Sequence, residues 1–291
     1  ETIDALNLKS DAIILNCTFD GGGHSIELCK RFPKIKILAI DQDRGAWDKA
    51  KSKFEELDCD ITFLNANFRD LDDLKNNDLN FLNHPLDGII LDLGLSSDQL
   101  ENSGRGFSFI KNEPLLMTMK ENPSSEDLTA KDIVNGWSES NLADIIYGYG
   151  EERFSRRIAK GIVEARQKKQ IETTFDLVEI IKESVPVVYR RGRLHFATRT
   201  FQALRIATND ELQTLTMGIT KGFEALKVGG RMAVISFHSL EDRIVKKFFK
   251  AKENEGKAKL VNKKPTISSI EELRKNNRAR SAKLRILEKI L

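Results

Sequence analysis

The clearest candidate for chemistry is a glycine-rich turn. Residues 16–25 read NCTFDGGGHS and follow directly on an apolar run at 12–17. Glycines let backbone amides approach a ligand closely, and the start of the helix that follows favours a negative group such as a carboxylate or phosphate. Asp41 lies 20 residues after Gly21, where a carboxylate can accept both hydroxyl hydrogens of a ribose. The two features predict a nucleoside-containing cofactor; ordinary turn glycines and a loop aspartate remain the alternative.

The details of the turn favour S-adenosylmethionine over a dinucleotide. Ile26 stands where the third glycine of the dinucleotide fingerprint should fall, and no hydride-transfer motif is present. We therefore expect the methionine part at the glycine turn, the ribose at Asp41 and the adenine near residues 67–70. Phe68 offers the adenine an apolar face, although it could equally be a core residue.

Two further residues are candidates for catalysis. Asp92 ends the apolar segment 86–92, and the carboxyl ends of parallel strands are where open α/β folds bind ligands. His238 directly follows the apolar segment 232–237, so it could border the same pocket. The alternative for His238 is that it caps the helix that we expect to open at Ser239.

These candidates need a parallel sheet to bring them together. Short apolar segments at 12–17, 35–41, 61–65, 86–92 and 232–237 predict strands, and helical patterns at 25–31 and 46–57 predict crossovers. From about Pro114 the pattern is helical only, with helices expected at 140–147, at 152–167 and after a capping box at Thr173. A helix capped by Asn209 and Asp210 then leads back to the sheet, and residues 251–265 are expected to form a loop.

The predicted fold is therefore α/β, a Rossmann-like sheet with an inserted all-helical domain. We expect residues 1–112 and 205–291 to form the cofactor-binding domain and residues 113–204 to form the insertion.

Composition and charge narrow the function further. The 291 residues are 40% hydrophobic and 31% charged, which is typical of a globular protein. The net charge is +3, but residues 1–150 carry −12 and residues 151–291 carry +15. The basic half favours a nucleic-acid partner, although a solvated surface is the alternative. No segment predicts a membrane span or a signal peptide.

The cysteines predict neither a disulfide framework nor a metal site. Cys17, Cys29 and Cys59 lie 12 and 30 residues apart, which is neither an even disulfide set nor a close thiol pair of the kind that binds zinc. We therefore expect reducing surroundings and no bound metal. The expected location is the cytoplasm, or an organelle if a targeting segment has been removed.

Five longer motifs then point to one family. They are, in order, GGHS at 22–25, DLGLSSDQL at 92–100, RGFSF at 105–109, TRTFQALRIATNDEL at 198–212 and SFHSLEDR at 236–243. Over nearly its whole length the chain resembles the RsmH (MraW) methyltransferases. The resemblance implies transfer of a methyl group from S-adenosylmethionine to N4 of a cytosine in the decoding region of small-subunit ribosomal RNA.

The resemblance also implies roles for individual residues. Substrate recognition is assigned to the helical insertion. Cofactor contacts are expected at Gly22, Gly23, His24, Asp41, Phe68, Asp92 and Gln99. Separately from the resemblance, positive charge makes a set of arginines candidates for binding RNA phosphates, with a surface or intradomain ion pair as the alternative for each: Arg105, Arg190, Arg191, Arg193, Arg199 and Arg205.

Some positions depart from the family pattern. Asn16 and Asp20 stand where an aspartate and a glycine are usual, and Leu116, Thr118 and Lys120 replace two acids and an arginine. Two alternatives therefore stay open: an RNA-binding ribosome-assembly factor with weakened activity, and a methyltransferase acting on a different amine. Free rRNA and an assembled particle are both possible substrates, and the sequence leaves the oligomeric state undetermined.

Overall fold

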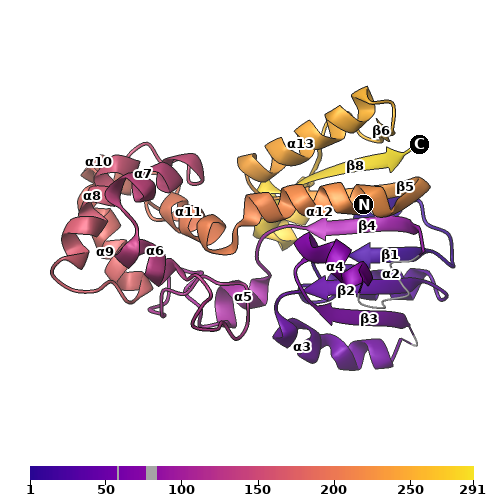
Figure 1. Ribbon diagram of the computed structural model, residues 1–291, viewed down its shortest axis with the longest axis horizontal. Coiled ribbons are helices and arrows are strands. Elements are labelled where there is room, and N and C mark those ends of the chain that lie inside the picture. Colours follow the sequence, from indigo (N-terminus) through magenta and orange to yellow (C-terminus); the bar gives the residue numbers. More distant parts are fainter. Residues whose placement is uncertain (58, 77–83) are drawn as a thin grey trace. The chain divides into compact units, whose positions relative to one another are not determined.

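The computed structural model describes residues 1–57, 59–76 and 84–291 (Figure 1). Contacts between residues divide the chain into two compact units. The first contains residues 1–94 and 212–291, and the second contains residues 95–211. The boundaries predicted from the sequence are at 112/113 and 204/205. Residues 95–112 belong to the helical unit because Phe107 is buried in that unit's core.

The first unit is built on a twisted sheet in the order β3, β2, β1, β4, β5, β8, β6. The pairs β3–β2, β2–β1, β1–β4 and β4–β5 are parallel, and β8 runs antiparallel to β5. The parallel strands are β1 (Ile13–Asn16), β2 (Lys36–Asp41), β3 (Asp60–Asn65), β4 (Leu86–Asp92) and β5 (Leu226–Ser236). This arrangement confirms the predicted Rossmann-like sheet.

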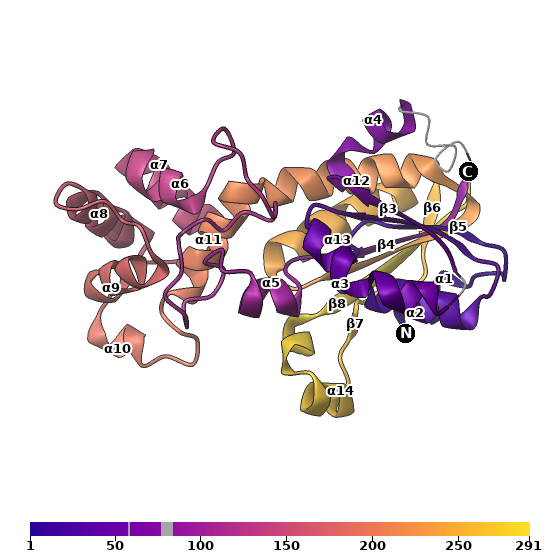
Figure 2. The same cartoon turned by 90° about the horizontal axis from the view of Figure 1, so that it is seen from below.

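Helices cover both faces of the sheet, as Figure 2 shows. Successive strand residues alternate between two apolar clusters: Ile14 faces one and Leu15 the other. One face is covered by α1 (Thr2–Leu6), α2 (Gly23–Arg31) and α3 (Arg44–Glu55). The other is covered by α4 (Leu71–Asn76), α12 (Glu211–Ala225) and α13 (Ser239–Asn254). Burial on both faces explains why the strands read as continuous apolar runs.

The C-terminal part of the sheet was not predicted. Residues 251–265, which were expected to form a loop, contain the last turn of α13 and the strand β6 (Ala258–Leu260). It is followed by β7 (Thr266–Ile267), α14 (Ile270–Lys275), η3 (Asn277–Ser281) and β8 (Lys283–Lys289). The strand β8 has the sequence KLRILEK, and Arg285 is stabilised by Asp242, whose Oδ1 accepts from its Nε at 2.7 Å. Paired basic residues can therefore be accommodated in this antiparallel strand.

The second unit is a helical bundle, as predicted. Its helices are α5 (Ser97–Asn102), α6 (Ala130–Gly136), α7 (Glu139–Gly148), α8 (Ser155–Arg166), α9 (Thr174–Ser184), α10 (Val187–Arg190) and α11 (Thr198–Asn209). Ile146, Ile158 and Leu177 meet in its core. The capping box predicted at Thr173 is present, with Asp176 as its partner.

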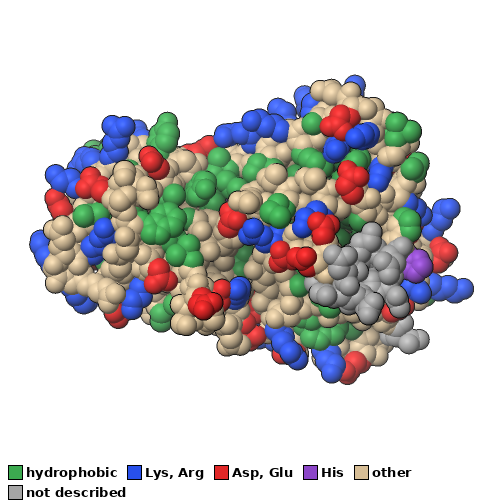
Figure 3. All heavy atoms as spheres, viewed as in Figure 1, with side chains coloured by type: hydrophobic (Ala, Val, Ile, Leu, Met, Phe, Trp, Pro, Cys, Tyr) green, Lys and Arg blue, Asp and Glu red, His purple; other side chains and the backbone are tan. Residues whose placement is uncertain are grey.

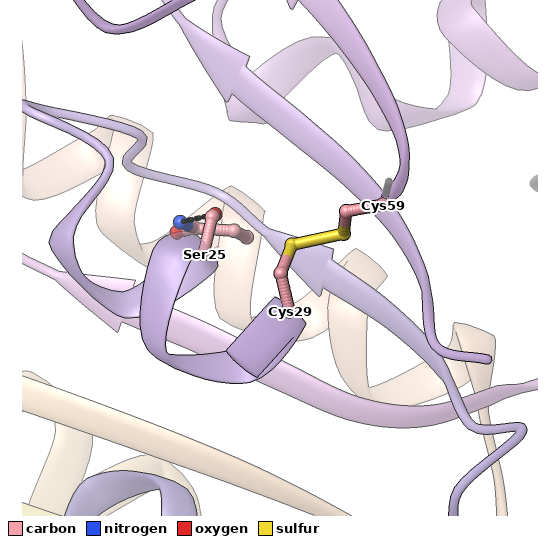
Figure 4. The surroundings of a disulfide bond; sticks show 4 residues. Ser25, Cys29 and Cys59 are labelled. Carbon is pink, nitrogen blue, oxygen red and sulfur yellow. Dashed lines mark hydrogen bonds between the residues drawn. A yellow bond between two sulfur atoms is a disulfide. The ribbon is translucent and has the colours of Figure 1, made fainter. Parts of the chain in front are cut away.

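A disulfide corrects the prediction from cysteine spacing. Cys29 on α2 is bonded to Cys59, the residue before β3, with their Cα atoms 5.6 Å apart (Figure 4). The bond closes a loop whose ends are 30 residues apart. Spacing gave no indication of this pairing, because it arises from the packing of α2 beside the start of β3. Cys17 is a free, buried thiol.

Candidate cofactor site at the carboxyl edge of the sheet

The glycine-rich turn is hydrogen-bonded to the neighbouring strands and has free space beside two of its glycines. Cys17 and Phe19 donate backbone hydrogen bonds to Ile90 and Ile40 on the neighbouring strands, at 2.9 and 3.0 Å. Gly22 has φ +77°, and a Cβ there would lie 2.9 Å from the Phe19 ring. At Gly21 and Gly23, by contrast, a Cβ would meet no atom within 4 Å. The turn therefore leaves free space beside its amides, which is what close approach of a ligand requires.

Asp41 lies beside this turn at the end of β2. Its Oδ2 accepts from the backbone N–H of Asp20 at 2.8 Å, and its Oδ1 accepts from that of Asp43 at 2.9 Å. Each carboxylate oxygen keeps a further lone pair, so a diol can still be bound. Burial raises the pKa of Asp41 to about 6, although these backbone hydrogen bonds oppose the shift.

Asp92 ends β4 on the same edge of the sheet. Its backbone N–H donates to Thr18 Oγ1 at 2.7 Å, and His24 Nε2 lies 3.3 Å from its Oδ2. Its other carboxylate oxygen, Oδ1, is buried and has no hydrogen-bond partner among the described residues. A buried acceptor without a donor is costly, so this oxygen fits a donor supplied by a ligand.

The edge is strongly acidic. The pKa of Asp20 is raised by burial and by the charges of Asp41, Asp92 and Asp43. Carboxylates that repel one another in this way are stabilised by a cation, and S-adenosylmethionine carries a sulfonium and an ammonium group. Sequence reasoning did not single out Thr18 or Asp43 for this site. Their places directly beside the glycine turn and after Asp41 were the available signal.

The two departures from the family pattern at this turn have separate explanations. Asn16 is fully buried; its Nδ2 donates to Ser25 Oγ at 2.9 Å and its Oδ1 accepts from Thr18 N–H at 3.2 Å. Asn16 thus ties the strand end to the first turn of α2. Asp20 has φ +51°, in the left-handed region where glycine is the usual residue and aspartate is tolerated.

Phe68 lies in η1 (Phe68–Asp70) and is half-buried against the core. Its ring fits over Gly218 on α12, where a Cβ would come within 2.3 Å of it. Packing against the core is therefore observed for Phe68, and its predicted contact with adenine stays a prediction.

His238 is the N-cap of α13. Its Nδ1 accepts from the backbone N–H of Glu241 at 3.4 Å, and the Glu241 carboxylate accepts from the backbone of Phe237 at 2.8 Å. This confirms the alternative given for His238, that it caps the helix that opens at Ser239. His238 Nε2 is buried without a hydrogen bond of good geometry, although Glu241 Oε1 is 3.1 Å away.

The remaining predicted site residues belong to the helical unit. Gln99 is buried and forms a capping box with Ser96, each accepting from the other's backbone N–H at 3.0 Å. Four of the predicted RNA-binding arginines make contacts within the unit. Arg105 donates to the carbonyls of Thr118 and Met119, Arg190 to Val185, Arg199 to Glu151, and Arg205 pairs with the Glu211 carboxylate. Arg191 and Arg193 are exposed.

Comparison with known protein families shows which family the chain belongs to. The profile of the MraW methylase family matches residues 1–290. The chain belongs to the MraW methylase family. Membership of this family makes it a methyltransferase of rRNA that uses S-adenosylmethionine as its cofactor. The glycine turn, Asp41 and the unpartnered oxygen of Asp92 fit that cofactor.

Several solved structures are similar to this family member. An rRNA methylase from Streptococcus thermophilus is 12% identical with a TM-score of 0.47, over 99% of this chain and 93% of that one. A Streptococcus mutans protein in complex with SAH is 13% identical with a TM-score of 0.47, over 99% and 95%. At such identity the likeness concerns the fold only. Among the described residues, no helix combines the length and apolar character that a membrane span needs.

Proposed function

We propose that the protein methylates N4 of a cytosine in the decoding region of small-subunit ribosomal RNA. Membership of the MraW methylase family supports rRNA methylation, and the five sequence motifs that resemble the RsmH enzymes support the finer assignment. The observation that carries the methyl-transfer part of the proposal is the arrangement at the sheet edge, where a glycine turn with open space meets Asp41 and Asp92; the choice of cytosine N4 rests on the motifs alone. We propose that it acts in the compartment in which the ribosome is assembled.

The cofactor supplies a methyl group on a sulfonium, which is already an excellent leaving group. The amides at Gly21 and Gly23 would hold its methionine part, and Asp41 would accept from its ribose hydroxyls. The Oδ1 atom of Asp92 would accept from a donor on the cofactor. These residues would fix the methyl group in place, so that orientation accounts for much of the rate.

The substrate amine is a weak nucleophile because its lone pair is delocalised into the cytosine ring. Its hydrogens must point at acceptors as the new bond forms. His238 is poorly suited to accept a proton, because its Nδ1 is used by the helix cap and the neutral ring then carries its hydrogen on Nε2. His238 Nε2 is also buried 3.1 Å from Glu241 Oε1, so we assign His238 to the helix cap and not to proton transfer. Carbonyl or hydroxyl groups near Asp92 would accept hydrogen bonds from the amine, and the proton that the methylated nitrogen releases would pass to water.

The test is transfer of labelled methyl from S-adenosylmethionine to small-subunit particles that lack the modification, followed by nucleoside analysis of the digested RNA. We expect N4-methylcytidine to form with the wild type and not with Asp92→Ala. Free rRNA and protein fractions are assayed in parallel. Methylation of another nucleoside or of protein would refute the proposed substrate, and failure to bind S-adenosylmethionine would favour an RNA-binding assembly factor.

A further inference from the structure

The arginines of α8 lie at a cavity to which no role has been given. A cavity of about 400 Å³ opens in the helical unit between the end of α7 and the start of α8. Its lining includes Asp144, Tyr147, Arg153, Phe154, Arg156 and Arg157. Its volume falls within the range of about 300–1,000 Å³ that is usual for small-ligand sites. Three basic groups and one acidic group face it, so it favours an anion.

The guanidinium groups at this cavity are available to a ligand. Arg153, Arg156 and Arg157 are exposed, and within the described residues none of them forms an ion pair with a carboxylate. This distinguishes them from Arg199 and Arg205, whose guanidinium groups are held by a carbonyl and a carboxylate. Figure 3 shows Lys and Arg side chains on the surface of the region around α7, α8 and α10, with acidic side chains between them.

The start of α8 adds to the positive potential. The N-cap residue Phe154 provides no side-chain cap, and the first turn contains no acidic residue. Arg156 and Arg157 are instead in that turn, where like charge adds to the positive end of the helix dipole. Two arginines in the first turn of this 12-residue helix are unfavourable by themselves and are stabilised when an anion binds there.

Aromatic rings lie beside the arginines at this cavity. The guanidinium of Arg153 lies 4.8 Å from the centre of the Phe154 ring and 5.1 Å from that of Tyr189, so the two rings hold it in position. Tyr147 is 67% exposed although it lines the cavity. An exposed ring beside fixed guanidinium groups suits a nucleic-acid base stacked next to its phosphates.

We propose that this cavity, lined by Tyr147, Arg153, Arg156 and Arg157, binds one unpaired nucleotide of the RNA substrate together with its flanking phosphates. The proposal rests on the proposed function for the identity of the RNA. It assigns Arg156 and Arg157 to phosphates and Tyr147 to the base. Because target bases must leave a stack to be modified, a holding site for a neighbouring nucleotide would keep the strand splayed.

The first test removes the two charges of α8 that we assign to phosphate. Binding of a single-stranded RNA containing the target sequence is measured against salt concentration for the wild type and for Arg156→Gln/Arg157→Gln. We expect the log–log slope to fall by about 1.4 and binding at physiological salt to weaken about tenfold. The control Lys160→Gln/Lys168→Gln removes two charges from the same region outside the cavity and should leave the slope near that of the wild type. An unchanged slope in the arginine variant would overturn the proposal.

The second test separates stacking from charge. Tyr147→Ala should weaken RNA binding about tenfold without changing the salt slope, and Tyr147→Phe should bind like the wild type. Equal loss in both variants, or no loss in either, would refute the stacking role. Affinity for S-adenosylmethionine and the melting temperature are measured for each variant and should be unchanged. If the wild type binds RNA through this cavity but makes no N4-methylcytidine, the proposed function fails and the cavity assignment stands.

Discussion

The raised pKa of Asp41 makes cofactor binding depend on pH. We expect the ionised carboxylate to accept from the ribose hydroxyls, and burial sets the pKa of that carboxyl at about 6. Lowering the pH from 7.5 to 5 therefore protonates Asp41 in the free protein and removes the acceptor. With a pKa of about 6, affinity for S-adenosylmethionine should fall about tenfold over this range. At the ordinary pKa of 3.8 the fall would be less than about 10%.

The same shift changes stability in the opposite direction. A carboxyl group with a higher pKa in the folded state binds its proton more tightly there than in the unfolded chain. Its contribution is therefore favourable at low pH and is lost as the pH rises through about 6. The difference between 3.8 and about 6 corresponds to about 3 kcal/mol of unfolding free energy lost at neutral pH. In the protein without cofactor, the contribution of Asp41 to the free energy of unfolding should accordingly increase as the pH is lowered toward 5.

Calorimetric titration with S-adenosylmethionine from pH 5 to pH 8 measures the effect. The wild type should show a break near pH 6, and Asp41→Asn should bind weakly at every pH with no break. The neighbouring carboxyl of Asp20 also has a raised pKa, because of burial and the charges of Asp41, Asp92 and Asp43. The matched variant Asp20→Asn should keep the break. A flat profile in the wild type, or a break that survives in Asp41→Asn, would refute the assignment of Asp41.

Four further predictions concern the turn and the disulfide. Gly22→Ala should lower the unfolding free energy by about 2–4 kcal/mol, because φ is +77° and the Phe19 ring is 2.9 Å from the added Cβ. Gly23→Ala, which meets no atom, should instead keep the melting temperature and lose cofactor affinity. Asp20→Asn should raise the melting temperature at pH 7, because it relieves a carboxylate whose pKa is raised by burial and by neighbouring charges. It should also reduce the preference for S-adenosylmethionine over S-adenosylhomocysteine, which lacks the sulfonium charge; an unchanged preference would contradict this. Cys29→Ser should lower the free energy of unfolding of the oxidised protein by roughly 3–4 kcal/mol, because it removes the disulfide that joins residues 30 positions apart. Thiol counting of unfolded wild type should give one free thiol before reduction and three after it, and three before reduction would disprove the bond.

The parallel part of the fold was predictable because local pattern and burial agree. Strands that are covered on both faces must be apolar throughout, and the segments ending at Asp41 and Asp92 read that way. The candidate site at the sheet edge was predicted from these strand ends together with the glycine-rich turn after the first strand. The strand β8 was missed because charges such as Arg285 interrupt its apolar pattern, and their partner Asp242 is 43 residues away. The Cys29–Cys59 bond was missed for a similar reason, since only the folded chain brings the two thiols together.

The sequence does not predict which arginines are held by contacts within the protein and which remain available to a ligand. A run such as YRRGR at 189–193 and an isolated Arg205 look equally basic in sequence, yet Arg190 and Arg205 are held by internal acceptors. A guanidinium has five donors, so any nearby carbonyl or carboxylate can bind it, and only the fold decides which ones remain free. Arg156 and Arg157 lie in the segment 152–167, for which the sequence predicts a helix and no site. Their charges become significant because the first turn of that helix borders a cavity and has no acidic residue to balance them.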